Sequence, residues 1–168
     1  MVLTRMFRTL LLATLLLAVL APAASAREID VPKRFATQLE RGRTQTTVPI
    51  LLPQTMRSDF RRFFAEGRAT VNAWRFDLAA ARGCNQATAC FIAEFKGVRD
   101  GKPRARRTIR LDRGRTGYYR PLSCGASCSP PSIEWRERHA LYSIQAKVGK
   151  RELVRMANSA IRNGPRLP

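Results

Sequence analysis

Hydrophobic and polar residues alternate in several short segments of this chain, which is typical of strands with one buried face. The strands expected from this alternation cover residues 71–80, 91–95, 107–112, 133–135 and 142–144. Glu137, Arg138 and His139 then form the turn between the last two strands. Hairpins at this spacing predict an antiparallel meander of about five strands.

Two other segments carry their apolar residues at helical spacing. In residues 55–65, Met56, Phe60 and Phe63 share one stripe, and Gly67 follows as a stop signal. In residues 150–161, a wide apolar arc includes Leu153, and Asn163-Gly164-Pro165 ends the segment. We therefore expect an α+β fold, in which the sheet is packed by a helix in the N-terminal half and by an amphipathic C-terminal helix.

The segments before residue 55 are harder to place. Residues 27–45 predict a lead-in with a short, mostly polar and loosely packed helix, with Pro32 near its start and Gly42 past its end. Residues 46–53 (TTVPILLP) contain two prolines, so they predict an edge strand or an extended segment. We take residues 46–168 as a single α+β domain.

The first 26 residues have the three regions of a secretory signal peptide. Arg5 and Arg8 precede the apolar run 9–20, and Ala24-Ser25-Ala26 is a cleavage signature. The alternative, an uncleaved anchor helix, would be short for a bilayer span. We expect cleavage after Ala26 and a mature protein in the periplasm or secreted.

The chain is strongly basic. It has 31 Lys and Arg against 12 Asp and Glu, and cleavage would remove two arginines and no acid, lowering the net charge from +19 to +17. The densest basic run, residues 96–120, ends near Tyr118 and Tyr119 and suggests a groove for a polyanion or an anionic membrane surface. The candidate anion-binding residues are Lys102, Arg104, Arg106, Arg110, Arg113 and Arg115. The alternative is a generally basic surface, because 26 arginines against 5 lysines also fit an arginine-rich composition. No motif of sequence-specific nucleic-acid binding is recognised.

The four cysteines are Cys84, Cys90, Cys124 and Cys128, for which three pairings exist. Export favours disulfides, and the turn-like residues inside each short loop favour Cys84–Cys90 with Cys124–Cys128. A zinc site of four cysteines and a redox-active C-x3-C pair are the alternatives, although neither has the usual spacing.

The sequence indicates no catalytic site, metal site or cofactor. His139 is the only histidine, and we interpret it as a turn residue rather than a general base. The carboxylates are scattered singly, and no nucleophile elbow or paired-acid motif is recognised. A hydrolase is therefore the least favoured hypothesis.

Several motifs together resemble an uncharacterised family of exported bacterial proteins. They are VPILLP at 48–53, the C-x5-C at Cys84, Gly117-Tyr118-Tyr119, CGASCSP at 124–130, Ile133-Glu134-Trp135 and LVRMANSAI at 153–161. The final third is also distantly similar to a module of unknown function in anti-sigma-factor and sporulation proteins.

The resemblance implies a small extracytoplasmic α+β domain and supplies no catalytic residue. The leading expectation is an exported, non-catalytic module that contacts anionic envelope polymers or lipids. The alternative is an extracytoplasmic sensing module for a membrane protein.

Overall fold

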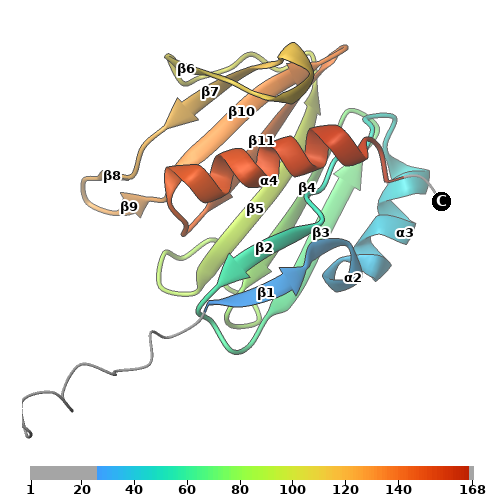
Figure 1. The fold of residues 1–168 in the computed structure, drawn as a ribbon. Helices are drawn as coiled ribbons and strands as arrows, with labels where there is room; N and C mark the ends of the chain where they lie inside the picture. The colour runs from blue at the N-terminus through green and yellow to red at the C-terminus, as the bar shows by residue number, and fades with distance from the viewer. Residues whose placement is uncertain (1–25, 167–168) are drawn as a thin grey trace, which may run out of the picture.

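The computed structural model of this protein describes residues 26–166. The expected signal peptide, apart from Ala26, lies outside these residues. The fold is α+β, and all its strand pairs are antiparallel, as expected (Figure 1). The helical elements are α2 (Val31–Arg34), α3 (Ala36–Gln45), the short 3-10 turn η2 (Asp112–Gly114) and α4 (Lys150–Asn163).

One large sheet contains seven strands, more than the five expected. In spatial order they are β3 (Phe64–Thr70), β4 (Ala73–Ala79), β5 (Phe91–Arg99), β11 (Ala140–Ala146), β10 (Ser132–Glu137), β7 (Thr116–Arg120) and β6 (Arg107–Arg110). Two small sheets pair β1 (Arg27–Asp30) with β2 (Thr55–Ser58) and β8 (Ser123–Cys124) with β9 (Cys128–Ser129). The order is not a simple meander, because the chain crosses from β5 to the far edge strand β6.

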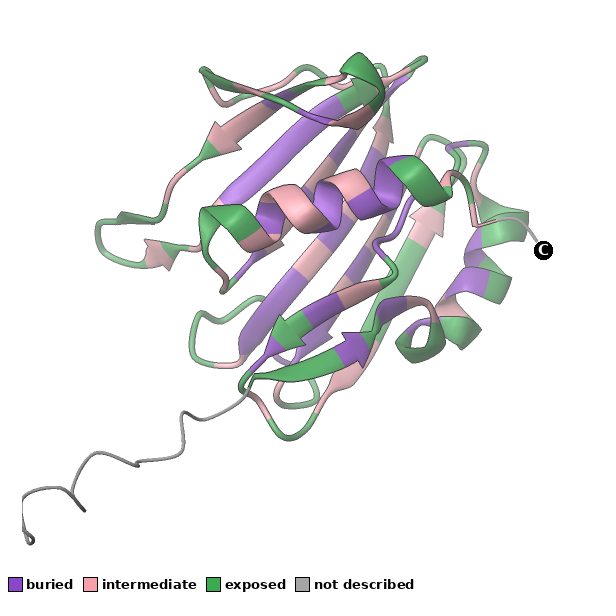
Figure 2. Cartoon of the chain, in the orientation of Figure 1, coloured by how far each residue is buried: buried purple, intermediate pink, exposed green. Residues whose placement is uncertain are grey.

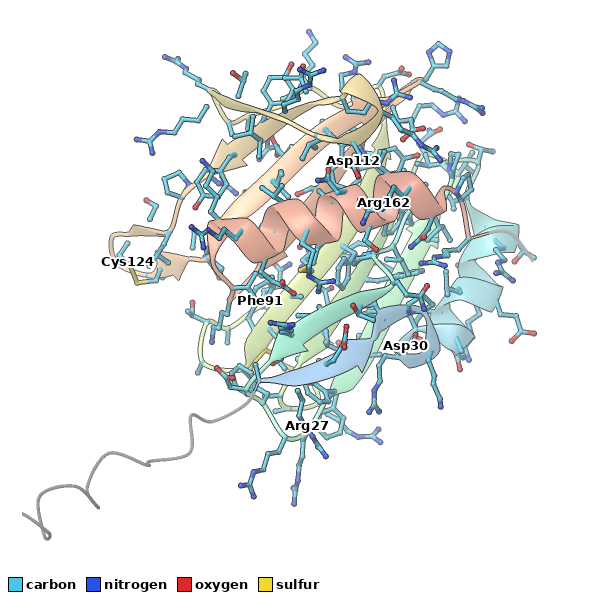
Figure 3. All side chains as sticks on the ribbon, viewed as in Figure 1. Arg27, Asp30, Phe91, Asp112, Cys124 and Arg162 are labelled. Carbon is cyan, nitrogen blue, oxygen red and sulfur yellow. A yellow bond between two sulfur atoms is a disulfide. The ribbon has the colours of Figure 1, made fainter. Side chains whose placement is uncertain are left out.

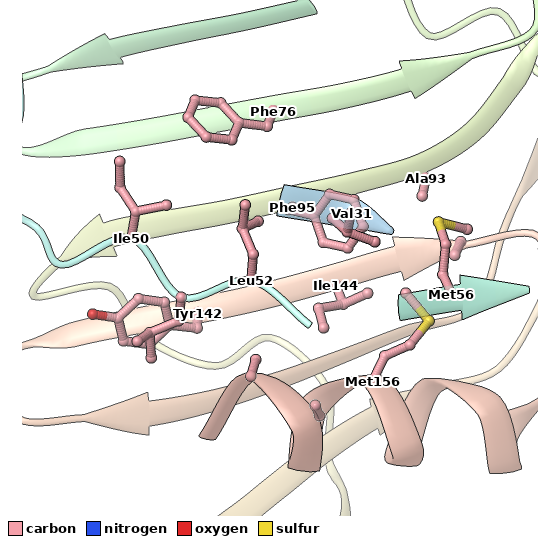
Figure 4. Packing of buried hydrophobic residues seen from close by; sticks show 14 of the residues in the cluster. Val31, Ile50, Leu52, Met56, Phe76, Ala93, Phe95, Tyr142, Ile144 and Met156 are labelled. Carbon is pink, nitrogen blue, oxygen red and sulfur yellow. The ribbon is translucent and has the colours of Figure 1, made fainter. Parts of the chain in front are cut away.

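The face of the sheet that α4 covers carries the core (Figures 1 and 2). At its centre Trp74, Tyr142 and Trp135 lie in one cross-strand row, with Gly97 between Trp74 and Tyr142. A Cβ on Gly97 would lie 2.4 Å from the indole nitrogen of Trp74, so only glycine fits at this position. Figure 4 shows the neighbouring layer, where Phe76 and Phe95 meet aliphatic side chains.

Helix α4 confirms the expected C-terminal helix. Its apolar arc is buried against β10, β11 and β2, and Leu153 and Ile161 are fully buried. Gly164 ends the helix with a φ of 65°, a conformation that glycine adopts without strain. Near this end of the helix, Arg162 forms an ion pair with Asp112 of η2 (Figure 3).

The helix expected at 55–65 is wrong. Residues 55–58 form β2, which pairs with β1 in the register Arg27↔Ser58, and Phe64 begins β3. Met56 is fully buried, while Phe60 and Phe63 lie in the turn between these strands and are only partly buried. The helical spacing of the three side chains was therefore coincidental, since pairing with a distant strand overrides a local periodicity.

Residues 27–45 pack more tightly than expected. Val31 and Phe35 are fully buried, and Phe35 stacks on Phe76 with ring centroids 5.3 Å apart. Gly42 lies inside α3 and not past its end. A Cβ at this position would lie 3.0 Å from Cδ1 of Ile50, so the helix passes close to this side chain.

Residues 46–53 belong to no helix or strand, and the chain bends at Thr47 and Val48. The carbonyl of Pro49 accepts a hydrogen bond from Trp74 Nε1 at 3.1 Å. The edge-strand alternative is therefore wrong, and the segment instead packs Val48, Ile50, Leu51 and Leu52 into the core without strand pairing.

Glu152 in the first turn of α4 joins this helix to β2. Its carboxylate accepts hydrogen bonds from Arg155 Nε at 2.8 Å and from the backbone N–H of Arg57 at 3.1 Å. The hydrogen bond from Arg155 is the largest cause that holds the pKa of Glu152 below its ordinary value. A lowered pKa means that ionised Glu152 stabilises the fold above the pKa of the unfolded chain, and that this stabilisation is lost as the pH falls.

Replacing Glu152 should therefore weaken the fold at neutral pH but not in acid. We expect Glu152→Gln to lower the free energy of unfolding by about 1.5–3 kcal/mol at pH 7, a typical value for hydrogen bonds to charged groups. The difference from wild type should shrink as the pH falls from about 5 to about 3. Urea denaturation across this pH range measures it, with Glu40→Gln on the exposed side of α3 as the control. An equal difference at every pH would contradict the prediction.

Candidate anion-binding surface

Both expected disulfides are confirmed. The Cα atoms are 5.8 Å apart in Cys84–Cys90 and 4.0 Å apart in Cys124–Cys128. The first closes the loop between β4 and β5, and the second closes the β8–β9 hairpin. Thr88 in the first loop donates a hydrogen bond to the carbonyl of Cys128 at 3.2 Å, so the two loops touch.

The face of the large sheet that points away from α4, the open face, is crossed by the connection between β5 and β6, residues 100–106. We name this connection the basic strap. A Cβ on Gly101 would lie 2.7 Å from Leu141 Cβ, so the strap lies directly on β11. Further along, Glu134 of β10 accepts the backbone N–H groups of Arg104 at 2.7 Å and of Ala105 at 3.4 Å. Only 8% of Glu134 is exposed, because the strap covers it.

Asp100 turns the chain out of β5 with a φ of 51°, and the geometry of the sheet requires the rest of the strap, residues 101–106, to be extended. It crosses four strand spacings, about 19 Å, and also travels the length of about four strand residues, roughly 13 Å. Seven residues linking Arg99 to Arg107 reach only slightly further than the resulting distance of about 23 Å. Side chains of such an extended segment point alternately to opposite sides, so every second residue of the strap must face solvent.

The basic residues of the strap occupy these outward positions. Lys102, Arg104 and Arg106 are exposed, whereas Gly101, Pro103 and Ala105 are partly buried. Three exposed arginines share the open face on neighbouring strands, namely Arg110 of β6, Arg120 of β7 and Arg136 of β10. We name one set of residues the basic surface: the six basic residues Lys102, Arg104, Arg106, Arg110, Arg120 and Arg136, together with the half-buried Tyr118 that lies among them. Its strands β10, β7 and β6 place one acid on the open face, Glu134, which is buried under the strap.

Two of the expected anion-binding residues do not belong to this surface. Arg113 lies in η2, and its Nη2 donates to the carbonyl of Arg162 at the end of α4, at 3.0 Å. Arg115 forms an ion pair with Glu137 at 3.4 Å, on the face of the sheet that α4 covers. The structure therefore places Lys102, Arg104, Arg106 and Arg110 together and separates Arg113 and Arg115 from them.

A row of acids on the other half of the open face was missed from the sequence. The strand register places Glu66, Asp77 and Glu94 side by side on β3, β4 and β5. Arg75 forms ion pairs with Asp77 at 2.9 Å and with Glu94 at 2.8 Å. Burial raises the pKa of Asp77 and Glu94 raises it further, whereas Arg75 lowers it. These acids are 11 and 17 residues apart in the chain, so only the register reveals them.

Two of these acids, Glu66 and Asp77, line a pocket of about 330 Å³ beneath the Cys84–Cys90 loop. Among residues 26–166, no group of three or more His, Cys, Asp or Glu side chains is arranged to hold a metal ion. The ion pairs with Arg75 give this half of the open face a balanced charge, in contrast to the basic surface.

His139 occupies the exposed turn between β10 and β11, as expected, and its carbonyl accepts the N–H of Asp100 at 2.6 Å. No helix within residues 26–166 is long and apolar enough to cross a membrane.

Comparison of the chain with protein-family models, curated proteins and solved structures finds no match. The resemblance to an uncharacterised exported family therefore stays a prediction.

The contact between Glu134 and the strap can be tested directly. Glu134→Ala removes the acceptor for two backbone N–H groups, so we expect a loss of about 1–3 kcal/mol in the free energy of unfolding. Amide hydrogen exchange at Arg104 and Ala105 should accelerate more than exchange in β10. Ser143→Ala, the neighbour of Glu134 on the same cross-strand row, should leave this exchange unchanged. Unchanged protection of Arg104 in Glu134→Ala would show that Glu134 does not hold the strap.

Proposed function

We propose that this chain is an exported, non-catalytic domain that binds an anionic polymer of the cell envelope on its basic surface. The observation that carries the proposal is the outward alternation of Lys102, Arg104 and Arg106 along the extended strap. Guanidinium groups bind sulfate, phosphate and carboxylate groups through paired hydrogen bonds, which suits a polymer with repeated anionic groups.

The distribution of charge supports a localised site over a uniformly basic surface. On the β3–β5 half of the open face, the acids Glu66, Asp77 and Glu94 lie among the basic side chains. On the β10–β6 half, Glu134 is buried and accepts hydrogen bonds from two backbone N–H groups of the strap. The same sheet face is therefore balanced at one end and basic at the other.

The spacing within the strap also suits a linear ligand. Alternate residues of an extended chain are about 7 Å apart, so three basic side chains follow one another along one line. Tyr118 lies in the same cross-strand row as Glu134 and is half-buried, so its ring can support a sugar or an apolar group of the polymer.

The two disulfides are compatible with an oxidising compartment. With the signal-peptide pattern of residues 1–26, they support the proposal of a periplasmic or secreted protein.

N-terminal sequencing of the protein recovered from the periplasm or the medium should begin at Arg27. Recovery of membrane-bound protein that still begins near Met1 would contradict cleavage.

Binding to heparin, a sulfated polysaccharide, tests the basic surface. The variant Lys102→Gln, Arg104→Gln, Arg106→Gln and Arg110→Gln should lose about a hundredfold or more in affinity at 50 mM salt, since each basic residue near an anionic surface contributes roughly 1 kcal/mol. The slope of log affinity against log salt should become shallower, because fewer counterions are released. Fluorescence titration across a salt series measures both quantities.

The matched control removes the same number of charges from elsewhere on the exposed surface. Arg41, Arg61, Arg62 and Arg151 are all exposed and lie on other elements or turns. Their replacement by glutamine should cost much less affinity. An equal loss in the two variants would show that the charge acts diffusely. Binding to anionic lipid vesicles but not to heparin would identify a membrane surface as the partner.

A further inference from the structure

A second pocket, distinct from the basic surface, opens where the covered face of the sheet ends. Its volume is about 330 Å³. Val48 and Leu51 of the 46–53 segment and Tyr142 of β11 give it an apolar wall, and the hairpin turn at Arg138 and the chain after α4 complete its rim. Val48, Leu51 and Tyr142 are each at least 97% buried, so core packing fixes this wall and only its small exposed part faces the pocket.

Two polar groups of this pocket lack partners. Tyr142 is only 2% exposed, and its hydroxyl has no hydrogen bond to any residue in the range 26–166. Glu137, which also lines the pocket, uses Oε1 to bind Arg115, whereas its buried Oε2 has no partner within the described part of the chain. Buried polar atoms without partners are rare in folded proteins, and here they are Oε2 of Glu137 and, in the same ion pair, Nε of Arg115.

The two groups are close enough to influence each other. Burial raises the pKa of Tyr142 and the Glu137 carboxylate raises it further, while Arg138 lowers it. The phenol therefore stays protonated at neutral pH. Tyr142 can donate or accept a hydrogen bond, whereas a carboxylate such as that of Glu137 can only accept, so the pocket suits a ligand with a hydrogen-bond donor.

Three guanidinium groups line the same pocket from separate segments. Arg99 ends β5 and binds the hydroxyl of Thr47, Arg113 lies in η2, and Arg138 lies in the β10–β11 turn. Arg138 makes no hydrogen bond or ion pair with residues 26–166. The rim is therefore cationic at one side while the carboxylate of Glu137 is anionic.

The backbone at two of these arginines is unusual. Arg113 has a φ of 54° and Arg138 a φ of 53°, in the left-handed region where glycine is preferred. In the two-residue β10–β11 turn only the first central residue, Arg138, has a positive φ, and this position favours glycine. An arginine that occupies it at a cost in backbone strain is a reason to look for a role of its side chain.

We propose that this pocket binds a small zwitterion, an α-amino acid with an apolar side chain. Its carboxylate meets the guanidinium of Arg138, with Arg99 and Arg113 nearby. Its ammonium group donates to the partly exposed carboxylate of Glu137, and its side chain packs along the wall at Val48, Leu51 and Tyr142.

This ligand class follows from the arrangement of charges. A simple anion would be repelled by the carboxylate of Glu137, and a simple cation would be repelled by three arginines. A long polymer does not fit an enclosure of about 330 Å³, which separates this site from the basic surface.

Three related compounds test the proposal by isothermal titration calorimetry with the purified protein. L-phenylalanine carries both charges, 3-phenylpropionate lacks the ammonium group, and 2-phenylethylamine lacks the carboxylate. We expect saturable binding of L-phenylalanine, binding of 3-phenylpropionate that is about tenfold or more weaker, and no binding of 2-phenylethylamine. L-leucine should bind and L-aspartate should not, because the wall of the pocket is apolar. No saturable binding of L-phenylalanine or L-leucine at millimolar concentrations would overturn the proposal.

Two pocket variants and one control assign the binding to these residues. Arg138→Gly removes the guanidinium at a φ that suits glycine, so it should keep or raise the melting temperature while it abolishes measurable binding of L-phenylalanine. Glu137→Gln should weaken L-phenylalanine about tenfold and leave 3-phenylpropionate unchanged. Arg110→Gln, on the basic surface, should change neither. Full binding by Arg138→Gly, or an equal loss in Arg110→Gln, would overturn the proposal without affecting the polymer experiment.

Discussion

The row of aromatic rings across the middle of the sheet is the packing contact on which the rest of this structure depends. Trp74 of β4, Tyr142 of β11 and Trp135 of β10 lie at one level of the sheet, with Gly97 of β5 between the first two and Gly117 of β7 beside the third. A Cβ on Gly97 would collide with Trp74, and one on Gly117 would lie 2.9 Å from Leu111 Cδ1. The two glycines leave room for the three large rings in a single row across β4, β5, β11, β10 and β7. The row forms the surface that α4 and the 46–53 segment cover.

Burial of a single face has consequences for the opposite one. Within residues 26–166, α2, α3 and α4 leave the open face of the seven strands without a helix (Figure 1), so that face must be polar or be crossed by other segments. The β5–β6 connection crosses this face, and its length only slightly exceeds the distance that it has to span. Because it is stretched, its residues alternate, and its lysine and arginines face solvent while its small residues lie on the sheet. The basic surface is thus a product of topology as well as of composition.

Elements with strong local patterns could be predicted from the sequence. The alternation around Trp74, Phe95 and Tyr142 and the apolar arc of α4 each reflect burial on one face. The disulfides also followed from local loops. The error at Met56–Phe64 arose because β2 depends on pairing with β1, almost thirty residues earlier. The seven-stranded order, the row of Glu66, Asp77 and Glu94, and the pocket at Tyr142 all depend on register between distant segments, which single-sequence periodicity does not contain.

The arginines of residues 99–115 show most clearly why sequence proximity is a poor guide to a site. Arg110 and Arg113 are three residues apart, yet the left-handed turn at Arg113 sends one to the open face and the other to the end of α4. Conversely, Arg99, Arg113 and Arg138 come from three elements and line one pocket. Charge that looks continuous along the chain is therefore divided between the basic surface on the open face and a separate pocket at the end of the covered face. The division is made by backbone conformation, since Arg113 and Arg138 both stand at left-handed positions of the chain.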